Sequence, residues 1–338
     1  MKPRVAVVFT GGTITMSVDE RLGAVIPSLS GAEVLSMVTN IDRFAEIIPV
    51  NFSALPGPHI TPEIMMKLSD EVQQLLERED ITGVVITHGT DTLEETAYLL
   101  DLTLNTVKPV VIVGAMRNSS ELGYDGPSNL AAAVCTVISS EACGKGVLVV
   151  MNNDVNAAGE VTKTNTLRLN TFQSLEFGAL GIVDNDEVIF HREVVHRQHL
   201  KPESLEGRVS LIKCAAGMDS RFIDFCVNQG DRGIVIEAMG RGNVPPLMMM
   251  GVKGAIEAGV IVVMVSRCPT GRVLGTYGYT GGGKELSDLG VILGGDLPGQ
   301  KARIKLMLAL GVTGNPHYIK RIFEQNQYLS SASNMRKG

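Results

Sequence analysis

Two short polar stretches, each placed directly after an apolar run, constrain the fold of this chain most. Thr10-Gly11-Gly12-Thr13 follows the apolar run at residues 4–9, and Thr87-His88-Gly89-Thr90-Asp91-Thr92 begins at the end of the run at residues 81–87. Short apolar runs that end in glycine and hydroxyl residues indicate buried parallel strands meeting their following loops. In open α/β sheets, ligands bind at that rim. The sequence therefore predicts a parallel sheet whose rim carries a ligand site.

The length and composition of the chain predict two domains. The chain has 338 residues, of which 44% are hydrophobic and 20% charged, so it can bury a sizeable core. We predict an α/β fold with two domains, each a largely parallel sheet with flanking helices, the larger N-terminal and the smaller C-terminal. The domains are assigned to residues 1–196 and 208–338, and residues 197–207 to a linker that is polar and contains Pro202 and Gly207.

Strands and helices are expected to alternate along both halves. The predicted strands of the first half are residues 4–9, 81–87, 109–114 and 146–151, and its predicted helices are residues 61–76, 92–102 and 127–139. The predicted strands of the second half are residues 209–213, 233–237 and 260–265, and its predicted helices are residues 220–228, 247–258 and 300–310. Residues 164–195 are predicted to be polar and rich in strands.

Charge and hydropathy exclude two classes of partner. The net charge is −6, the sequence pI is about 5.6, and no basic stripe is present, which argues against a nucleic-acid partner. No apolar run approaches the roughly 18 residues that a membrane span needs, so no membrane partner is expected. The apolar run at residues 5–9 is too short for the core of a signal peptide. A cytoplasmic location is therefore the expectation.

Metal and cofactor chemistry has no support in the sequence. The five cysteines are widely spaced and include no C-x-x-C pair, so neither a zinc site nor a disulfide framework is predicted. His191, His196 and His199 lie in a polar stretch without ligand geometry and are assigned to a linker-like segment. No cofactor is expected, because no motif for a nucleotide or flavin is present. The two polar stretches instead offer threonines and an aspartate, which favour chemistry with a hydroxyl nucleophile.

Two stretches resemble the two signatures of the bacterial-type asparaginase/glutaminase family: Phe9-Thr10-Gly11-Gly12-Thr13-Ile14 and the stretch from Ile86 to Thr96. The resemblance continues collinearly through blocks that begin at Val113, Asp125, Val161, Arg267 and Gln300, and it spans nearly the whole chain. It implies an amidohydrolase that acts on a small-molecule amide, with the catalytic site in the N-terminal domain. It also implies a homodimer or homotetramer whose sites lie near subunit interfaces.

The resemblance assigns catalytic roles to four residues. Thr13 matches the nucleophile of the family, and Thr90, Asp91 and Lys163 match its second catalytic cluster. A lysine desolvated beside a carboxylate can relay protons, which is the help that a weakly acidic hydroxyl needs. Which threonine attacks first stays open. The expected substrate-binding residues are Gly12, Gly57, Pro58, Thr90, Asp91, Ala115 and Asn243, with Asp91 on the ammonium group of the substrate and Asn243 contributed by a neighbouring subunit.

Purely structural interpretations exist for several of these residues. Asp91-Thr92-Leu93-Glu94 fits an N-terminal capping box, in which Asp91 accepts from the first helical turn. Gly11 and Gly12 suit a tight turn, and Lys163 could be a solvated loop residue. His88 is interpreted as a structural hydrogen-bonding residue rather than a base. The collinear resemblance favours a role in the site for Asp91, Gly12 and Lys163.

Two departures from the family pattern bear on the substrate. The loop at residues 14–27, which we call the flap, lacks the tyrosine that the family usually places there, and Glu20, Arg21 and Tyr124 are candidates to replace it. Gly57 and Pro58 occupy the positions that commonly cradle the α-carboxylate of the substrate, and proline offers no donor. Ser53 or His59 could compensate if the loop is rearranged.

Three functions follow from these observations. The first is hydrolysis of L-asparagine to L-aspartate and ammonia. The second is hydrolysis of an N-substituted or cyclic amide, because a site without carboxylate donors would leave the charge of a free amino acid poorly paired. The third is a non-catalytic amino-acid-binding paralogue, which the presence of Thr13, Thr90, Asp91 and Lys163 together disfavours.

Overall fold

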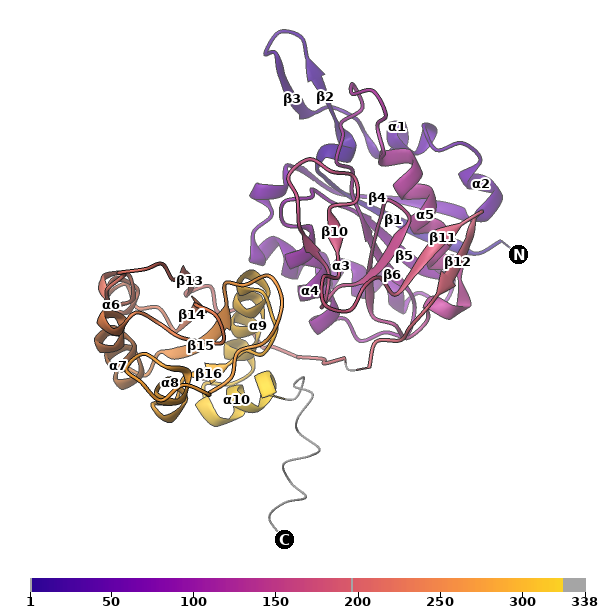
Figure 1. Cartoon of the computed structure of the whole chain (residues 1–338). Helices are drawn as coiled ribbons and strands as arrows, with labels where there is room; N and C mark the ends of the chain where they lie inside the picture. The colour runs from indigo at the N-terminus through magenta and orange to yellow at the C-terminus, as the bar shows by residue number, and fades with distance from the viewer. Residues whose placement is uncertain (1, 196, 325–338) are drawn as a thin grey trace. The chain divides into compact units, whose positions relative to one another are not determined.

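A computed structural model describes residues 2–195 and 197–324 of the chain (Figure 1). The chain divides into two compact units between His199 and Leu200. This junction lies inside the segment predicted to link the domains, while the predicted domain boundaries at residues 196 and 208 stay predictions. His196, at the first of these boundaries, lies outside the described residues. Both units contain largely parallel sheets with flanking helices, as the sequence predicts.

The first unit is built on a mixed sheet of eight strands. Its order is β12 (Glu187–Phe190), β11 (Gly181–Asp184), β8 (Asp154–Ala157), β7 (Val147–Met151), β6 (Val110–Val113), β5 (Gly83–Thr87), β1 (Arg4–Gly11) and β4 (Glu46–Leu55). The strands from β7 to β4 run parallel, and β8, β11 and β12 extend the sheet in antiparallel fashion. Every residue of β5, β6 and β7 is buried, as expected for parallel strands covered on both faces.

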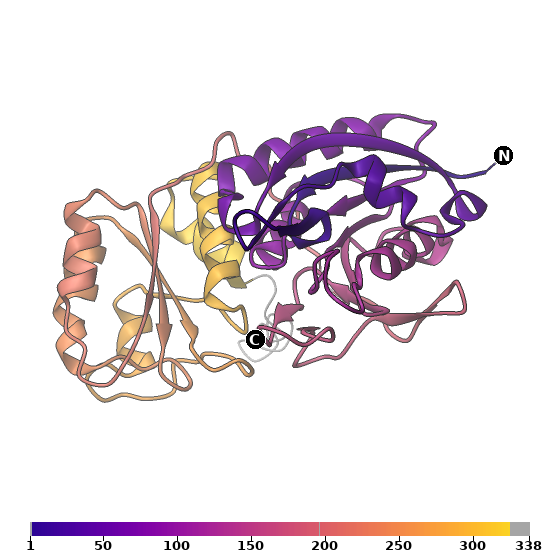
Figure 2. The same cartoon turned by 90° about the horizontal axis from the view of Figure 1, so that it is seen from above.

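Helices cover both faces of this sheet (Figure 2). Helices α3 (Pro62–Glu77) and α4 (Leu93–Thr103) pack side by side on one face, and α5 (Gly126–Ile138) lies with the short helices α1 (Gly31–Ser36) and α2 (Ile41–Phe44) on the other. Helix α3 begins where Thr61 accepts a hydrogen bond from the Ile64 amide and Pro62 occupies the first turn. It buries Met65, Leu68 and Val72, which recur at helical spacing.

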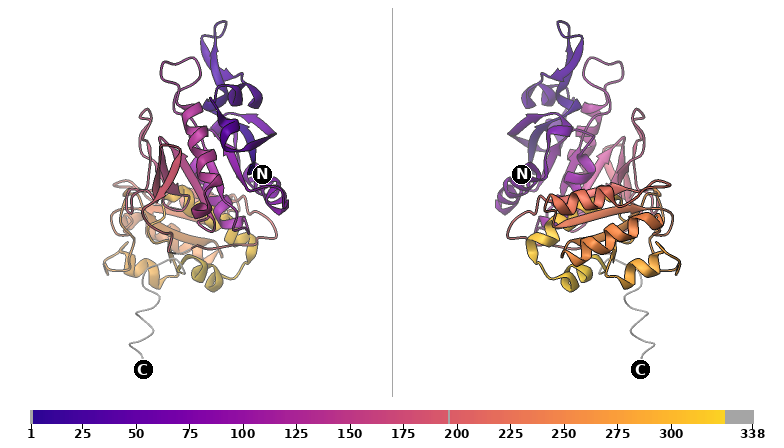
Figure 3. Two further views of the ribbon diagram at one scale, coloured as in Figure 1. Left: turned by 90° about the vertical axis from the view of Figure 1, so that its right-hand side faces the viewer. Right: turned by 90° about the vertical axis from the view of Figure 1, so that its left-hand side faces the viewer.

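Shorter elements complete the first unit. The 3-10 turns are η1 (Thr13–Thr15), η2 (Gly57–His59) and η3 (Ser140–Ala142). Strands β2 (Met16–Asp19) and β3 (Ala24–Pro27) pair as an antiparallel hairpin within the flap, and β9 (Thr162–Lys163) pairs with β10 (Phe172–Gln173). The hairpin projects from the unit (Figure 3), so most of its residues are exposed. The sequence predicts neither this hairpin nor strand β4.

The second unit contains a four-stranded parallel sheet in the order β13 (Val209–Lys213), β14 (Gly233–Ala238), β15 (Ile261–Ser266) and β16 (Ile292–Leu293). Its helical segments are α6 (Arg221–Asn228), η4 (Pro246–Met248), α7 (Met249–Glu257), α8 (Gly283–Asp288), α9 (Gly299–Val312) and α10 (Pro316–Glu324). Helices α6 and α7 pack against each other, and α9 packs along β13, β14 and β15. None of the helices in the described residues is long and apolar enough to cross a membrane.

Candidate active site

The two polar stretches lie side by side at the carboxyl ends of neighbouring strands. Strands β1 and β5 are parallel neighbours, with Phe9 opposite Thr87. The hydroxyl of Thr10 donates to the carbonyl of Thr87 over 2.8 Å and ties the end of one strand to the other. The loop that carries Thr13 therefore emerges next to the loop that carries Thr90, at the rim where parallel sheets place their ligands.

Three glycines from three loops are in direct backbone contact at this rim. A Cβ atom added to Gly12, whose φ is +82°, would lie 2.4 Å from Cα of Gly89. A Cβ atom on Gly89 would in turn lie 2.6 Å from Cα of Gly57. Distances this short leave no room for any side chain, and the positive φ of Gly12 disfavours other residues as well. The loops after β1, β4 and β5 therefore approach one another most closely at these glycines. We call Gly12, Gly57 and Gly89 the glycine contact.

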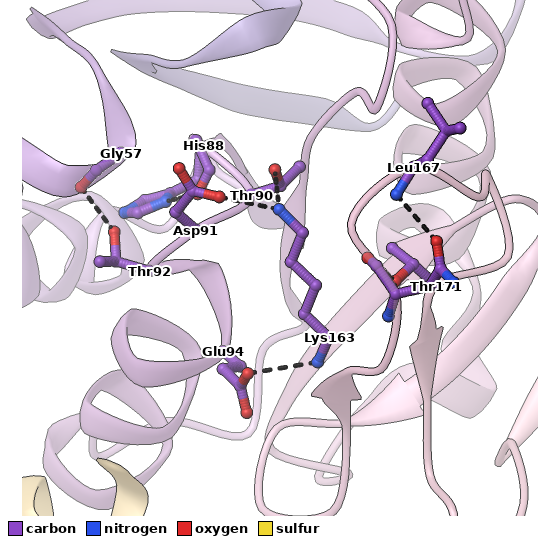
Figure 4. Close-up of polar contacts among 11 residues, drawn as sticks. Gly57, His88, Thr90, Asp91, Thr92, Glu94, Lys163, Leu167 and Thr171 are labelled. Carbon is purple, nitrogen blue, oxygen red and sulfur yellow. Dashed lines mark hydrogen bonds and ion pairs between the residues drawn. The ribbon is translucent and has the colours of Figure 1, made fainter.

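Lys163 joins the two residues that follow Gly89. Its Nζ donates to the Thr90 hydroxyl over 2.9 Å and forms an ion pair with Oδ1 of Asp91 at 2.8 Å (Figure 4). The side chain of Lys163 is 18% exposed and that of Asp91 is 59% exposed. The lysine is thus largely removed from water, while the carboxylate remains open to a ligand. Such an arrangement can hold and move a proton at the Thr90 hydroxyl.

Glu94 holds the backbone of Lys163 in place, a role that the sequence pattern does not predict. Its Oε1 accepts from the Lys163 amide over 3.2 Å (Figure 4). The same oxygen accepts from the Thr162 hydroxyl over 3.1 Å. Glu94 is 6% exposed and lies in the first turn of α4. One signal is present in the sequence, because this acid follows Asp91 by three residues. That spacing favours a capping box, which is a different role.

The loop between β9 and β10 is closed by Thr171. The hydroxyl of Thr171 accepts from the Asn165 amide over 2.7 Å, and its carbonyl accepts from the Thr164 amide over 2.8 Å. Asn165 in turn accepts from the amide of Leu167 over 2.9 Å (Figure 4). These bonds stiffen the turn that follows Lys163 and restrict where that side chain can reach.

The capping box expected at Asp91 does not form. The N-cap of α4 is Thr92, and no side chain caps the helix there. The hydroxyl of Thr92 donates instead to the carbonyl of Gly57 over 2.8 Å. The carboxylate of Asp91 is engaged by Lys163, because a cation within ion-pair distance competes with the neutral amides of the helix.

His88 is buried and neutral beneath the rim. Its Nδ1 lies 2.9 Å from the carbonyl of Gly89, and its Nε2 lies 2.9 Å from the Thr96 hydroxyl. Burial lowers the pKa of His88 to about 4, so near neutral pH Nδ1–H donates to the carbonyl and Nε2 accepts from Thr96. Both ring nitrogens are occupied, in keeping with the structural role expected for this residue.

Thr13 begins the 3-10 turn η1 and is half-buried. The turn is closed by Thr15, whose amide and hydroxyl both donate to the carbonyl of Gly12, each over 2.9 Å. Across residues 2–195 and 197–324, the Thr13 hydroxyl makes no hydrogen bond. Of the three candidates to replace the missing flap tyrosine, Glu20 and Arg21 lie exposed on the hairpin, whereas the hydroxyl of Tyr124 donates to the carbonyl of Ile14.

The residues expected at the α-carboxylate of the substrate do not present side-chain donors to it. Gly57 is buried and its carbonyl already accepts from Thr92 and from the Ile60 amide, while Pro58 is exposed. Ser53 does not compensate, because its hydroxyl donates to the carbonyl of Thr10 over 2.7 Å. His59 lies exposed at the end of η2.

The remaining expected residues lie apart from this cluster in the chain. Ala115 is buried two residues after the end of β6. Asn243 belongs to the second unit, where it forms an isolated bridge with Met239. Its buried Oδ1 has no hydrogen-bond partner in the part of the chain that the structure describes. Glu285, also in the second unit, accepts from the Gly281 amide over 2.8 Å.

Comparison with known proteins gives matches over both units. Residues 4–196 match the family described as asparaginase, N-terminal, and residues 208–323 match the glutaminase/asparaginase C-terminal domain. An L-asparaginase of Bacillus licheniformis is 36% identical over 310 residues, covering 92% of this chain and 96% of that protein. One of the subunits of a glutamyl-tRNA(Gln) amidotransferase from Pyrococcus abyssi is 33% identical, covering 96% of this chain and 76% of that protein. A crystal structure of a probable cytoplasmic L-asparaginase from Campylobacter jejuni is 34% identical in sequence and has a TM-score of 0.86. The match covers 95% of this chain and 99% of that chain.

Proposed function

The chain belongs to the asparaginase family, and we propose that it is an amidohydrolase that converts L-asparagine to L-aspartate and ammonia. The observation that carries this proposal is the bridge that Lys163 makes to Thr90 and Asp91, next to the loop of Thr13. Hydrolysis of a primary amide needs a nucleophile, a proton acceptor and a donor for the departing ammonia. The residues that we assign to these roles lie at one rim of the sheet.

The proposed reaction begins with attack of the Thr13 hydroxyl oxygen on the amide carbon. The hydroxyl proton passes to the group formed by Thr90 and Lys163, and the developing oxyanion is held by backbone N–H groups of the glycine loops that contain Gly12 and Gly89. The C–N bond breaks when the nitrogen receives a proton from the same group, and ammonia leaves. Water then hydrolyses the ester on Thr13 and releases the acid. Asp91 pairs with Lys163 and holds the ammonium group of the substrate.

A second substrate class is favoured by the loop at Gly57 and Pro58. Pro58 has no N–H, and the Ser53 hydroxyl already donates to the carbonyl of Thr10. A free α-carboxylate would find few donors there, and an unpaired charge in a partly buried site is costly. The same catalytic group would then act on an N-substituted or cyclic amide. A non-catalytic binder of amino acids is the third candidate, and it would not need all four catalytic residues.

We further propose a homodimer or homotetramer in the cytoplasm, with Asn243 reaching the site of a neighbouring subunit and no cofactor involved. The resemblance to the family, in which the position of Asn243 contributes to the site of a neighbouring subunit, supports this part of the proposal. Light scattering of the purified protein measures the assembly directly. A monomer at micromolar concentration with full activity would contradict this part of the proposal.

The deciding experiment is ammonia release from L-asparagine, L-glutamine, D-asparagine and a panel of N-substituted and cyclic amides. Turnover of L-asparagine at low millimolar concentration supports the first proposal, and turnover of another amide alone supports the second. Thr13→Ala is the matched inactive control for contaminating hydrolases. Binding of an amino acid without release of ammonia or any acid product would favour the third candidate.

A further inference from the structure

The chain between β6 and α5 lies against the chain that follows Thr13. Residues 116–125 form a loop that rises beside the β2–β3 hairpin (Figure 3). We call residues 116–125 the brace. The brace contacts the flap at alternate residues: its Tyr124 hydroxyl donates to the carbonyl of Ile14, and the amide and hydroxyl of Ser119 donate to the carbonyl of Met16 over 3.0 and 2.9 Å.

A third contact lies farther along the hairpin. The amide of Val18 donates to the hydroxyl oxygen of Ser120 over 3.0 Å. Val18 is 45% exposed, so water can replace this bond if it is lost. The Ile14 carbonyl is different, because Ile14 is fully buried and lies inside the turn η1. The bond from Tyr124 is therefore the one closest to Thr13 and the hardest for solvent to replace.

Hydrogen bonds within the brace and to α5 hold it in place, so it can serve as a fixed support. The carboxylate of Asp125 accepts from the amides of Met116 and Arg117, with distances of 3.0 and 2.9 Å, and from the side-chain amide of Asn129. The guanidinium of Arg117 donates to the carbonyls of Leu122 and Gly123 over 3.1 and 3.2 Å. These bonds close the loop on both sides of Tyr124 and leave it little freedom to move away from the flap.

The ring of Tyr124 has a fitted position within the brace. A Cβ atom added to Gly126 would lie 2.4 Å from Cζ of Tyr124, so only glycine leaves space for the ring there. Burial and the nearby Asp125 carboxylate raise the pKa of the Tyr124 phenol to about 12. The phenol stays protonated at physiological pH and remains a hydrogen-bond donor to Ile14.

We infer that Tyr124 is a positioning residue, whose hydroxyl fixes the Ile14 carbonyl and thereby the turn that presents the Thr13 hydroxyl. The flap contains no tyrosine, so this phenol reaches the nucleophile's turn from a different segment of the chain. Because its proton is donated to a backbone carbonyl, Tyr124 acts through the orientation of Thr13. The inference rests on the proposed function, in which Thr13 is the nucleophile.

The test compares Tyr124→Phe with Ser120→Ala. Each variant removes one hydroxyl from the brace and one bond to the flap, and Phe keeps the ring that contacts Gly126. We expect Tyr124→Phe to lower kcat roughly tenfold with KM within about twofold, since misorientation of a nucleophile affects the chemical step. Ser120→Ala is expected to leave kcat within about twofold of the wild type, because its bond lies four residues from Ile14 and is open to water.

A readout independent of catalysis is hydrogen exchange at the Thr15 amide, which closes the turn on Gly12. We expect faster exchange in Tyr124→Phe and an unchanged rate in Ser120→Ala. Wild-type kcat and wild-type exchange in Tyr124→Phe, alongside an inactive Thr13→Ala, would overturn the inference and leave the proposed function standing. Full activity of Thr13→Ala would instead overturn the proposed function, and the exchange data would then report the brace contact alone.

Discussion

Thr13 and Thr90 follow neighbouring parallel strands, yet their surroundings are built in opposite ways. Thr90 is 7% exposed, and its hydroxyl is already bonded to Lys163. Thr13 is half-buried, and in the described part of the chain its hydroxyl has no partner. The loop of Thr90 is fixed by side chains from α4 and β9, whereas the turn of Thr13 leads directly into an exposed hairpin.

This difference indicates a division of labour within the site. A hydroxyl that is held by a lysine suits proton transfer, because its hydrogen-bond partner is in place before the substrate arrives. A hydroxyl without a partner is free to approach a carbonyl carbon, provided that its backbone is held. The loop of Thr90 is therefore arranged for proton transfer before the substrate binds. The hydroxyl of Thr13 finds its partner only when the substrate is present.

The largest expected effect comes from removing the hydroxyl of Thr13. Thr13→Ala should lower kcat by more than about 10³-fold, as loss of a nucleophile does in other hydrolases. Thr90→Ala should retain slow acylation, because the attacking hydroxyl is still present. Mass spectrometry of protein quenched during turnover should find an acyl group on Thr13 in the wild type and in Thr90→Ala. An acyl group on Thr90 would reverse the roles that we assign.

The next largest effect tests whether the lysine of the second loop acts chemically. Lys163→Met should lower kcat by about 10²- to 10⁴-fold, the range for loss of a proton-transfer group. Lys145 offers a matched control, because its side chain is 7% exposed and pairs with the exposed Glu193 at 2.6 Å. Lys145→Met should lower the melting temperature while kcat stays within about twofold of the wild type. Equal losses of activity in both variants would mean that Lys163 is only structural.

A smaller effect is expected from Glu94, which supports the second loop from behind. Glu94→Ala removes the acceptor for the Thr162 hydroxyl and the Lys163 amide, so Lys163 should shift and kcat should fall by about tenfold. Glu77→Ala, which removes an exposed carboxylate on α3 that accepts from Gln73, is the control and should stay within about twofold of the wild type. Steady-state kinetics with the best amide substrate measures both. A wild-type kcat in Glu94→Ala would show that Lys163 holds its position without this carboxylate.

The smallest effect concerns stability beneath the rim rather than catalysis. The folded-state pKa of His88 is about 4, below the unfolded value near 6.5, so the unfolded chain binds the extra proton between these values. The stability associated with neutral His88 is complete above pH 6.5 and falls as the pH drops toward 4, by roughly 2–3 kcal/mol at pH 4.5. Urea unfolding at pH 7 and pH 4.5 should show this loss in the wild type and a smaller one in His88→Gln. The same loss in both proteins would assign the acid sensitivity to other groups.

The sequence predicts the strands that carry the site because each is buried on both faces. Strands β1, β5, β6 and β7 are all expected from sequence, and their apolar runs reflect that burial. Strand β4 is missed because it pairs only with β1, at the edge of the sheet, and mixes exposed polar residues with Pro49. Proline in a sequence argues against a central strand but is tolerated on an edge strand. A pattern search for buried strands therefore overlooks an edge strand that contains proline.

The candidate site is only partly predictable for a similar reason. Lys163 lies 73 residues from Thr90 in sequence, and only the resemblance to a family places them together. Local pattern predicts a capping box at Asp91 and Glu94, and both carboxylates instead turn toward strand β9, through Lys163 and Thr162. Tyr124 can be named as a candidate from sequence, but its bond to Ile14 exists only because the brace and the flap are brought together by the fold.

The glycine contact has a consequence for how this protein can be altered. A methyl group on Gly12 would lie 2.4 Å from Cα of Gly89, and one on Gly89 would lie 2.6 Å from Cα of Gly57, so either substitution displaces a neighbouring loop. A methyl group on Gly57 would meet its nearest atoms at 3.4 Å, which is an ordinary contact. Single substitutions at Gly12 and Gly89 should therefore be lost from any library selected for function. Substitutions that change the substrate specificity must instead occur at neighbouring positions, such as the exposed Pro58 and the flap. Directed evolution of this scaffold would therefore do best to hold Gly12 and Gly89 constant and randomise the loops around them.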